Sequence, residues 1–248
     1  SWNWKAGTTS GIATNGSTTI TPSAYSFNQT SGFSILKYTG NDTAGAKLAH
    51  GLGVAPAMII IKNLVTADNW VVYNSSGMTS SQYMAINNTT TLVTSASESW
   101  NGVDPDSINI TLGSHSQVND SELMVAYCFA DVQGYSKFGS YIGNGNNNGT
   151  FIYTGFKPQF IITKGTGNVS SWCITDTKRS TFNDGLLKFL KVNETDDESY
   201  RNNYDMLSNG FKIRTTDADY NQNGDNYIYM AFAEAPLVGT NNVPATAR

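Results

Sequence analysis

Short apolar runs separated by clusters of glycine, asparagine, serine and threonine recur along the whole chain. The runs are rich in β-branched and aromatic residues, which is typical of strands that are joined by tight turns. The pattern predicts strands over 33–38, 58–62, 70–73, 82–86, 108–112 and 123–130, and again over 150–153, 160–164, 172–175, 188–192, 211–215 and 227–233. Residues 186–192 alone also have a helical appearance. The fold class that we expect is therefore all-β, with antiparallel β-sandwich units.

Landmark residues of the first half of the chain return in the same order in the second half. The landmarks, separated by 102 or 103 positions, are Gly40 and Gly143, Pro56 and Pro158, Trp70 and Trp172, and Phe129 and Phe232. Such a constant offset is the signature of an internal repeat. We therefore expect two tandem, internally duplicated units, repeat 1 over 33–134 and repeat 2 over 135–248, preceded by an N-terminal connector over 1–32. One pseudo-symmetric sandwich is the alternative.

Composition limits the class of partner. Only 14% of the 248 residues are charged and the formal net charge is −4, so the chain lacks the basic face of a nucleic-acid-binding protein. The longest apolar runs, such as 57–61 and 123–130, have the length of strands and are too short to cross a bilayer. We expect neither nucleic-acid binding nor membrane insertion. Cys128 and Cys173 follow or lie in apolar runs, and we expect them to be buried free thiols.

The segment HGLGVAPAMIIIKN, from His50 to Asn63, resembles a phosphate-binding loop at first sight. A dinucleotide fingerprint, however, needs a helix after its glycines, and here a strand follows. Thr154 stands in place of His50 in the second repeat. The segment is therefore interpreted as a turn that leads into a buried strand, with His50 as a turn or core residue.

Metal binding and catalysis find little support in the pattern. Residues 219–225 carry oxygen donors at the spacing of a calcium loop, but Met230 stands where the bidentate glutamate would be, and a hairpin turn explains the segment. Asp104 and Asp106 are the first carboxylates to consider for glycan hydrolysis. We expect no cofactor, no metal and no enzymatic activity, with a glycan depolymerase as one alternative.

Two loops that the repeats do not share are the candidate binding sites. Trp70 and Trp172 match between the repeats and are expected in the core, whereas an exposed Trp100 among polar residues suits a sugar, because the ring face covers C–H groups and the polar side chains bind hydroxyls. The alternative is that these aromatic residues only anchor long loops. The candidate glycan-binding residues are Trp100, Asn101, Asp104 and Asp106 in the first repeat and Tyr200, Arg201, Asn203 and Tyr204 in the second.

Several segments together resemble a known family: GFSILKYTGN, HGLGVAPAMIIIKN, NWVVYN, AYCFADVQGYSKFGSYIGNGN and IYMAFAEAP. The sequence is similar to a C-terminal β-rich domain, of unknown function, in tail-fibre-type proteins of marine bacteriophages. The resemblance spans nearly the whole chain, and the segment that joins the repeats is its most specific part. It implies an extracellular, virion-attached module of a tail fibre or related appendage, a homotrimer like most fibres.

The function that we expect from these observations is that of a non-enzymatic adhesin that binds a receptor on the host surface. Its partners would be bacterial surface carbohydrate or a protein receptor, together with other tail proteins of the virion. A structural or decoration protein of the virion, which makes only protein–protein contacts, is the alternative from a different class.

Overall fold

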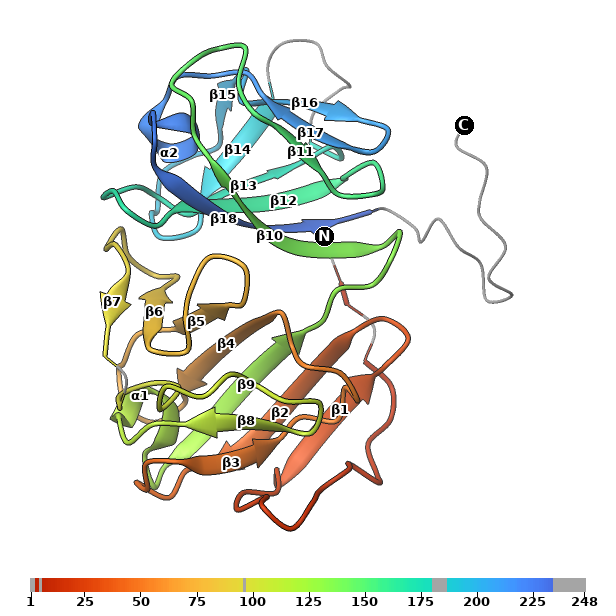
Figure 1. Ribbon diagram of the computed structural model, residues 1–248, viewed down its shortest axis with the longest axis vertical. Coiled ribbons are helices and arrows are strands. Elements are labelled where there is room, and N and C mark those ends of the chain that lie inside the picture. The colour runs from red at the N-terminus through yellow and green to blue at the C-terminus, as the bar shows by residue number, and fades with distance from the viewer. Residues whose placement is uncertain (1–2, 5, 96, 180–186, 234–248) are drawn as a thin grey trace. The chain divides into compact units, whose positions relative to one another are not determined.

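The computed structural model describes residues 3–4, 6–95, 97–179 and 187–233 (Figure 1). Its regular structure consists almost entirely of antiparallel strands, which confirms the predicted all-β class. The chain divides into two compact units. Unit 1 comprises Ser1–Ile86 and Leu92–Asp131, and unit 2 comprises Asn87–Thr91 and Val132–Arg248.

Unit 1 contains two sheets with an apolar core between them. The larger sheet has seven strands in the order β1-β2-β9-β4-β5-β6-β7, and the smaller sheet pairs β3 with β8. The core joins side chains from both sheets, for example Leu36 and Ile59 with Leu48 and Ile110. The elements are β1 (Ala24–Asn28), β2 (Phe33–Thr39), β3 (Ala46–Ala49), β4 (Met58–Asn63), β5 (Val71–Asn74), β6 (Gln82–Ala85), β7 (Val93–Thr94), β8 (Asn109–Leu112), α1 (Ser116–Asn119) and β9 (Leu123–Phe129).

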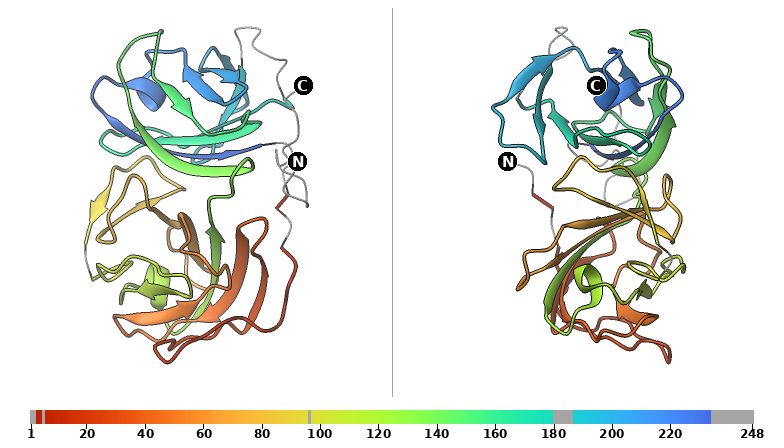
Figure 2. Two further views of the ribbon diagram at one scale, coloured as in Figure 1. Left: turned by 45° about the vertical axis from the view of Figure 1, so that its right-hand side comes forward. Right: turned by 90° about the vertical axis from the view of Figure 1, so that its left-hand side faces the viewer.

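Unit 2 is built in the same way, and Figure 2 shows its strands from two further sides. Its larger sheet has the order β10-β18-β12-β13-β14-β15, and its smaller sheet has the order β11-β17-β16. Aromatic residues fill much of the core, including Tyr204, Phe211 and Tyr227. The elements are β10 (Ser136–Ile142), β11 (Phe151–Tyr153), β12 (Phe160–Gly165), β13 (Cys173–Asp176), β14 (Leu187–Lys191), β15 (Ser199–Arg201), β16 (Tyr204–Leu207), β17 (Gly210–Ile213), α2 (Ala218–Asn221) and β18 (Asn226–Phe232).

The two units share strand order and register. In unit 1 the last long strand, β9, lies between β2 and β4, and in unit 2 the last strand, β18, lies between β10 and β12. Met58 is paired with Phe129 on β9, and Phe160 is paired with Phe232 on β18. The sequence landmarks therefore occupy equivalent places, although a common origin by duplication stays a prediction.

A buried asparagine at the end of the short helix links the loops of each unit. In unit 1 the Asn119 amide donates to the carbonyls of Thr43 and Gly113, at 2.9 and 2.8 Å, and accepts from the amide of Asn41 at 3.0 Å. Both Asn119 and its counterpart in unit 2, Asn221, are fully buried.

In unit 2 the Asn221 amide donates to the carbonyls of Asn146 and Thr215, at 2.8 and 2.7 Å, and accepts from the amide of Asn144 at 2.9 Å. The loops of both units are thus anchored by the same side-chain chemistry, because buried backbone groups need a partner.

Residues 187–191 form the strand β14, as the predicted strand over 188–192 indicated, and not a helix, since Leu187 and Phe189 alternate with half-buried residues on a sheet. Two parts of the expected structure differ from the observed one. The segment 219–225 is not a hairpin turn, because it begins in α2 and connects β17 and β18, which belong to different sheets. The expected connector contributes β1, which pairs with β2 along its whole length.

Candidate functional site

Trp100 lies in the core of unit 1 and not on its surface. Its side chain is 1% exposed, and its ring centroid lies 5.6 Å from that of Tyr73. The expectation of an exposed aromatic platform at Trp100 is therefore wrong. The polar neighbours in its sequence form the turn that brings the indole into the core, with Asn101 in the left-handed region at φ 52°.

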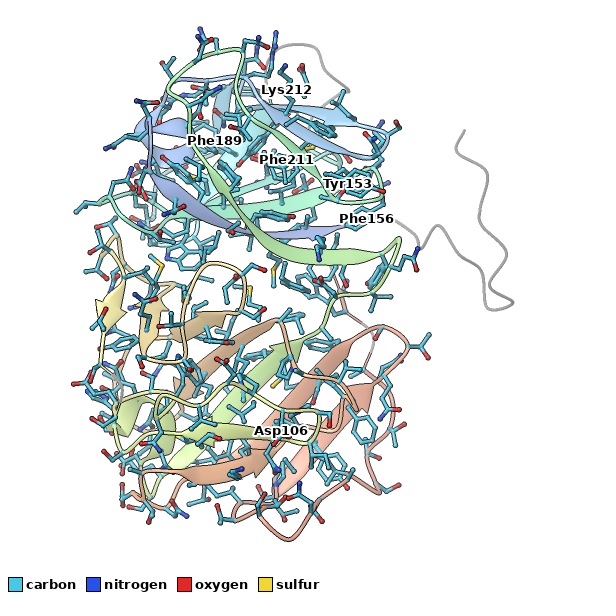
Figure 3. The ribbon with its side chains drawn as sticks, viewed as in Figure 1. Asp106, Tyr153, Phe156, Phe189, Phe211 and Lys212 are labelled. Atoms are coloured by element: carbon cyan, nitrogen blue, oxygen red, sulfur yellow. The ribbon has the colours of Figure 1, made fainter. Side chains whose placement is uncertain are left out.

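The carboxylates near Trp100 have separate structural tasks. Asp104 accepts a hydrogen bond from the Tyr73 hydroxyl at 3.2 Å. Asp106, labelled in Figure 3, accepts from the backbone amides of Ile108 and Asn109, both at 2.7 Å. Partial burial raises the pKa of Asp106, but these two hydrogen bonds lower it, and the pKa lies below its usual value overall. Asp106 therefore acts as a turn-forming residue at the start of β8.

A cavity of about 650 Å³ in unit 1 contains only one residue of this first group, Asp104. Its wall is formed by residues 54–57, the end of β5, the loop that follows β5, Asp104 and Pro105, and Ala130 and Asp131, which follow β9. Tyr73 contributes to the wall but is 2% exposed, so its ring face is not available for stacking.

The second group of candidates is divided between core and surface. Tyr204 is 1% exposed, and its hydroxyl lies 2.7 Å from that of Thr163. Asn203 is fully buried, and in the described part of the chain neither its side-chain Nδ2 nor its side-chain Oδ1 has a hydrogen-bond partner. Tyr200, at 60% exposure, and the exposed Arg201 lie on the edge strand β15.

Tyr200 and Arg201 both line a second cavity, of about 610 Å³, which we call the β15 cavity. All of its lining residues belong to unit 2. The carboxylates around it are Asp196, Asp197, Glu198, Asp217 and Asp219, and the other lining residues are Phe189, Lys191, Ser199, Tyr200 and Arg201. Phe189 is marked in Figure 3.

The register of β14 and β15 determines which side chains share a face. Arg201 is paired with Leu187 and Ser199 with Phe189, so these four residues point to the same face of the sheet, which is the core face. Tyr200 is paired with Lys188 on the opposite face, and the Lys188 ammonium lies 5.2 Å from the centroid of the Tyr200 ring. Among the described strands, the β15 cavity thus lies at the edge of the larger sheet of unit 2.

Ion pairs hold the cationic side chains of the β15 cavity in place. The Arg201 guanidinium pairs with Asp217 and lies 5.8 Å from the centroid of the Phe189 ring. The Lys191 ammonium lies 3.2 Å from Glu194 and 3.8 Å from Asp219. Burial lowers the pKa of Lys191, but the hydrogen bond to Glu194 and the charge of Asp219 raise it overall.

Glu198 is also paired, at 2.9 Å from the Lys188 ammonium and 3.1 Å from the Arg179 guanidinium. The hydrogen bond from Lys188 is the main cause that lowers the pKa of Glu198. The site therefore combines fixed cations with five carboxylates, two of which, Asp196 and Asp197, are exposed. Such a set can accept and donate hydrogen bonds to a polyhydroxylated ligand.

The sequence pattern did not indicate that Asp217 and Asp219 belong to this site. They lie at the start of α2, far from β15 along the chain, and only the fold brings them to Arg201. The run of acidic residues at 196–198 was a visible signal, but adjacent charges usually mark a solvated loop.

His50 has a structural role in the turn that precedes β4. The residue is fully buried, its Nδ1 accepts from the Leu52 amide at 3.2 Å, and its Nε2 lies 3.0 Å from the Asp106 carbonyl. Burial lowers its pKa, so the ring is neutral and its Nε2–H donates to that carbonyl. In unit 2 the Thr154 hydroxyl accepts from the Phe156 amide at 3.4 Å. The interpretation of His50 as a turn and core residue agrees with this geometry.

Other expected features have mixed outcomes. Cys128 and Cys173 are buried free thiols, as expected. Trp172 is in the core at 1% exposure, but Trp70 is 36% exposed and stacks against Tyr127, so the expectation that Trp70 is buried is wrong.

In the described ranges, no helix is long and apolar enough to span a membrane. Among the same residues, no group of three or more histidine, cysteine, aspartate or glutamate side chains is arranged to hold a metal ion.

Comparison with known proteins places the chain in a family. Residues 1–236 match the family described as a domain of unknown function, DUF7483. No curated protein and no solved structure matches the chain. Since the match covers both units and nearly the whole length, the chain belongs to the DUF7483 family.

Proposed function

We propose that this chain is a non-enzymatic carbohydrate-binding module and that the β15 cavity is its sugar site. The observation that carries the proposal is the composition of that cavity. A guanidinium, a hydroxyl, two exposed carboxylates and an exposed tyrosine line one space of about 610 Å³. Ligand sites in proteins commonly have this size and contain a few convergent polar groups.

The chemistry of these groups suits sugar hydroxyls. Carboxylates accept hydrogen bonds from hydroxyl groups, and a guanidinium donates in a fixed fork geometry that two neighbouring oxygens satisfy. Arg201 is held by Asp217 and by the Phe189 ring, so little side-chain entropy is lost when it binds. Tyr200 also lines the cavity, although its ring is directed to the opposite face of the sheet, toward Lys188.

The charge of the residues that line the β15 cavity further limits the class of sugar that it can bind. Five carboxylates face two cations around the cavity, so the local potential disfavours an acidic polysaccharide. We therefore propose a neutral or amine-bearing sugar as the ligand class.

The arrangement of Asp104 and Asp106 in unit 1 does not favour the alternative of a glycan depolymerase that uses these two carboxylates. Glycosidases place two carboxyl groups on either side of the scissile bond. Asp104 lines the cavity of unit 1, whereas Asp106 is engaged by two backbone amides and is not part of the cavity wall. The two residues do not form a catalytic pair around one space.

The setting that we propose is an extracellular appendage of a virion. It is supported by the resemblance to β-rich domains of bacteriophage tail-fibre-type proteins. In that setting the sugar belongs to the host surface, other tail proteins are the structural partners, and the module works as a homotrimer. Binding at the fibre tip would then serve host attachment.

A glycan array tests the proposal. The wild-type chain should bind neutral or amine-bearing glycans, and Arg201→Gln should weaken that binding at least tenfold. Arg214→Gln is the matched control, because Arg214 also forms an ion pair, at 3.3 Å from Asp205, but lies outside the β15 cavity. Equal binding by the two variants, or no binding by the wild type, would overturn the proposed sugar site.

A further inference from the structure

Among the described residues, one edge of β11 in unit 2 has no strand beside it. β11 lies at the end of its sheet and pairs only with β17 in the described part of the chain, with Ile152 opposite Phe211. The amide of Ile213 donates to the Thr150 carbonyl, and the amide of Thr154 donates to the Asn209 carbonyl. Because backbone groups alternate in direction along a strand, the amides and carbonyls of Phe151 and Tyr153 point away from β17.

The equivalent edge in unit 1 is covered. Leu48 on β3 and Ile152 on β11 are both buried and central to their strands, and His50 and Thr154 follow in the same turn position. Lys47 and Ala49 are therefore the counterparts of Phe151 and Tyr153.

The covering segment comes from the N-terminal part of the chain. The amides of Thr19 and Ile20 donate to the Lys47 carbonyl, at 3.0 and 2.9 Å, and the Ala49 amide donates to the Ile20 carbonyl at 3.2 Å. Ile20 forms a parallel bridge with Leu48 and is itself buried in the core. Unit 1 thus shows that the edge of β3 pairs with an extended segment that runs parallel to it.

Unit 2 has no corresponding segment in the described chain. The covering residues in unit 1 precede β1, whereas unit 2 is entered directly from β9, which ends at Phe129, and β10 begins at Ser136. At the same time its open edge carries aromatic side chains, with Phe151 44% and Tyr153 66% exposed. Ile142, at the end of β10, is 59% exposed.

Exposed apolar side chains on an unpaired edge are normally avoided, because such an edge invites pairing with another chain. In unit 2 the patch and the open edge coincide on one strand. Tyr153 and Phe189 are labelled at separate places in Figure 3, and neither Phe151 nor Tyr153 lines the β15 cavity. The edge of β11 is therefore distinct from the proposed sugar site.

We propose that β11 is the docking strand for an extended peptide segment of another protein chain, which adds to the sheet parallel to β11. The proposed binding mode is the one by which residues 18–20 pair with β3 in unit 1, where main-chain hydrogen bonds join the two segments. Such hydrogen bonds supply most of the affinity when a peptide adds to a sheet edge. The Phe151 carbonyl accepts and the Tyr153 amide donates. The expected segment is uncharged and contains a threonine followed by a β-branched aliphatic residue, like Thr19 and Ile20.

The test uses a synthetic peptide of residues 15–22, NGSTTITP, with blocked ends and a fluorescent label. Its binding to the full chain is measured by fluorescence anisotropy. Tyr153→Pro should weaken binding at least tenfold, because proline removes the outward amide while Ile152 and Thr154 keep their bonds to β17. Tyr153→Ala, which keeps the amide, should lose less affinity than Tyr153→Pro.

Control peptides and variants distinguish main-chain pairing with β11 from nonspecific binding to its exposed aromatic side chains. The same peptide with Thr19→Pro and Ile20→Pro lacks the two donors and should not bind. Val169→Ala truncates an exposed apolar side chain elsewhere in unit 2, outside the β15 cavity, and should leave peptide binding unchanged. Circular dichroism of the Tyr153→Pro variant checks that it folds. Absence of binding to the wild type, or equal binding by wild type and Tyr153→Pro, would overturn the proposal.

Discussion

The buried asparagines offer the sharpest test of how each unit is held together. Asn119 and Asn221 are fully buried, and each joins three backbone groups of nearby loops through its side chain. Asn203 is also fully buried, but in the described part of the chain its side-chain amide makes no hydrogen bond. The same substitution, asparagine to leucine, therefore removes a set of hydrogen bonds at two positions and none at the third.

The expected magnitudes follow from the partners. A buried backbone group that loses its partner costs about 1–3 kcal/mol, and Asn119→Leu leaves three groups unpaired. Asn41 and Thr43 are exposed, so water can reach their backbone groups in part and each of the three groups should cost about 1 kcal/mol. We therefore expect Asn119→Leu to lower the free energy of unfolding by about 3 kcal/mol. Asn203→Leu should change the free energy of unfolding by less than about 1 kcal/mol, or increase it.

Urea unfolding followed by tryptophan fluorescence measures these effects. Trp100 reports on unit 1 and Trp172 on unit 2, since each is buried in the core of its own unit. Asn119→Leu should lower the stability of unit 1, and Asn221→Leu should lower that of unit 2. If Asn119→Leu and Asn203→Leu differ by less than about 0.5 kcal/mol, the asparagine side chain does not hold the loops and the reasoning is refuted.

Other predictions concern His50, Trp100 and the two cysteines. Because burial lowers the pKa of His50, the folded state disfavours its proton, so His50 contributes stability that is present above about pH 6.5 and is lost as the pH falls. The urea midpoint of the wild type should therefore fall more between pH 7.5 and pH 5 than that of His50→Thr, and equal decreases would contradict this. Trp100→Ala should destabilise unit 1 by about 3–5 kcal/mol in urea unfolding and leave glycan binding intact, whereas selective loss of binding would restore Trp100 as a ligand residue. Burial raises the pKa of Cys128 and raises that of Cys173 to about 12, so a thiol reagent at pH 8 should label both only after unfolding, and rapid labelling of the native chain would contradict their burial.

The strands with β-branched and aromatic residues could be predicted from the sequence, but others could not. β10 escaped the pattern because Gly139 interrupts its apolar residues. In the structure the side chain of the cross-strand partner Tyr229 fills the place of a Cβ at Gly139, with its hydroxyl oxygen only 2.5 Å from where that Cβ would be. The glycine therefore permits close packing within a strand, which a local propensity does not reveal.

The binding site was harder to predict, because its residues depend on contacts that are distant in sequence. Trp100 has polar neighbours but is buried against Tyr73 from another strand. Arg201 was recognised, whereas its partner Asp217 belongs to the start of α2 and meets it only in the folded unit. Local patterning thus identifies the elements, and tertiary packing decides which loop side chains stay exposed.

Amide chemical-shift mapping, during titration with a glycan that binds on the array, tests most directly whether unit 2 binds sugar in the β15 cavity. We expect perturbations at Ser199, Tyr200 and Arg201 and at the start of α2, with none around Trp100. Shifts confined to the cavity of unit 1, near Asp104, would contradict the proposed sugar site.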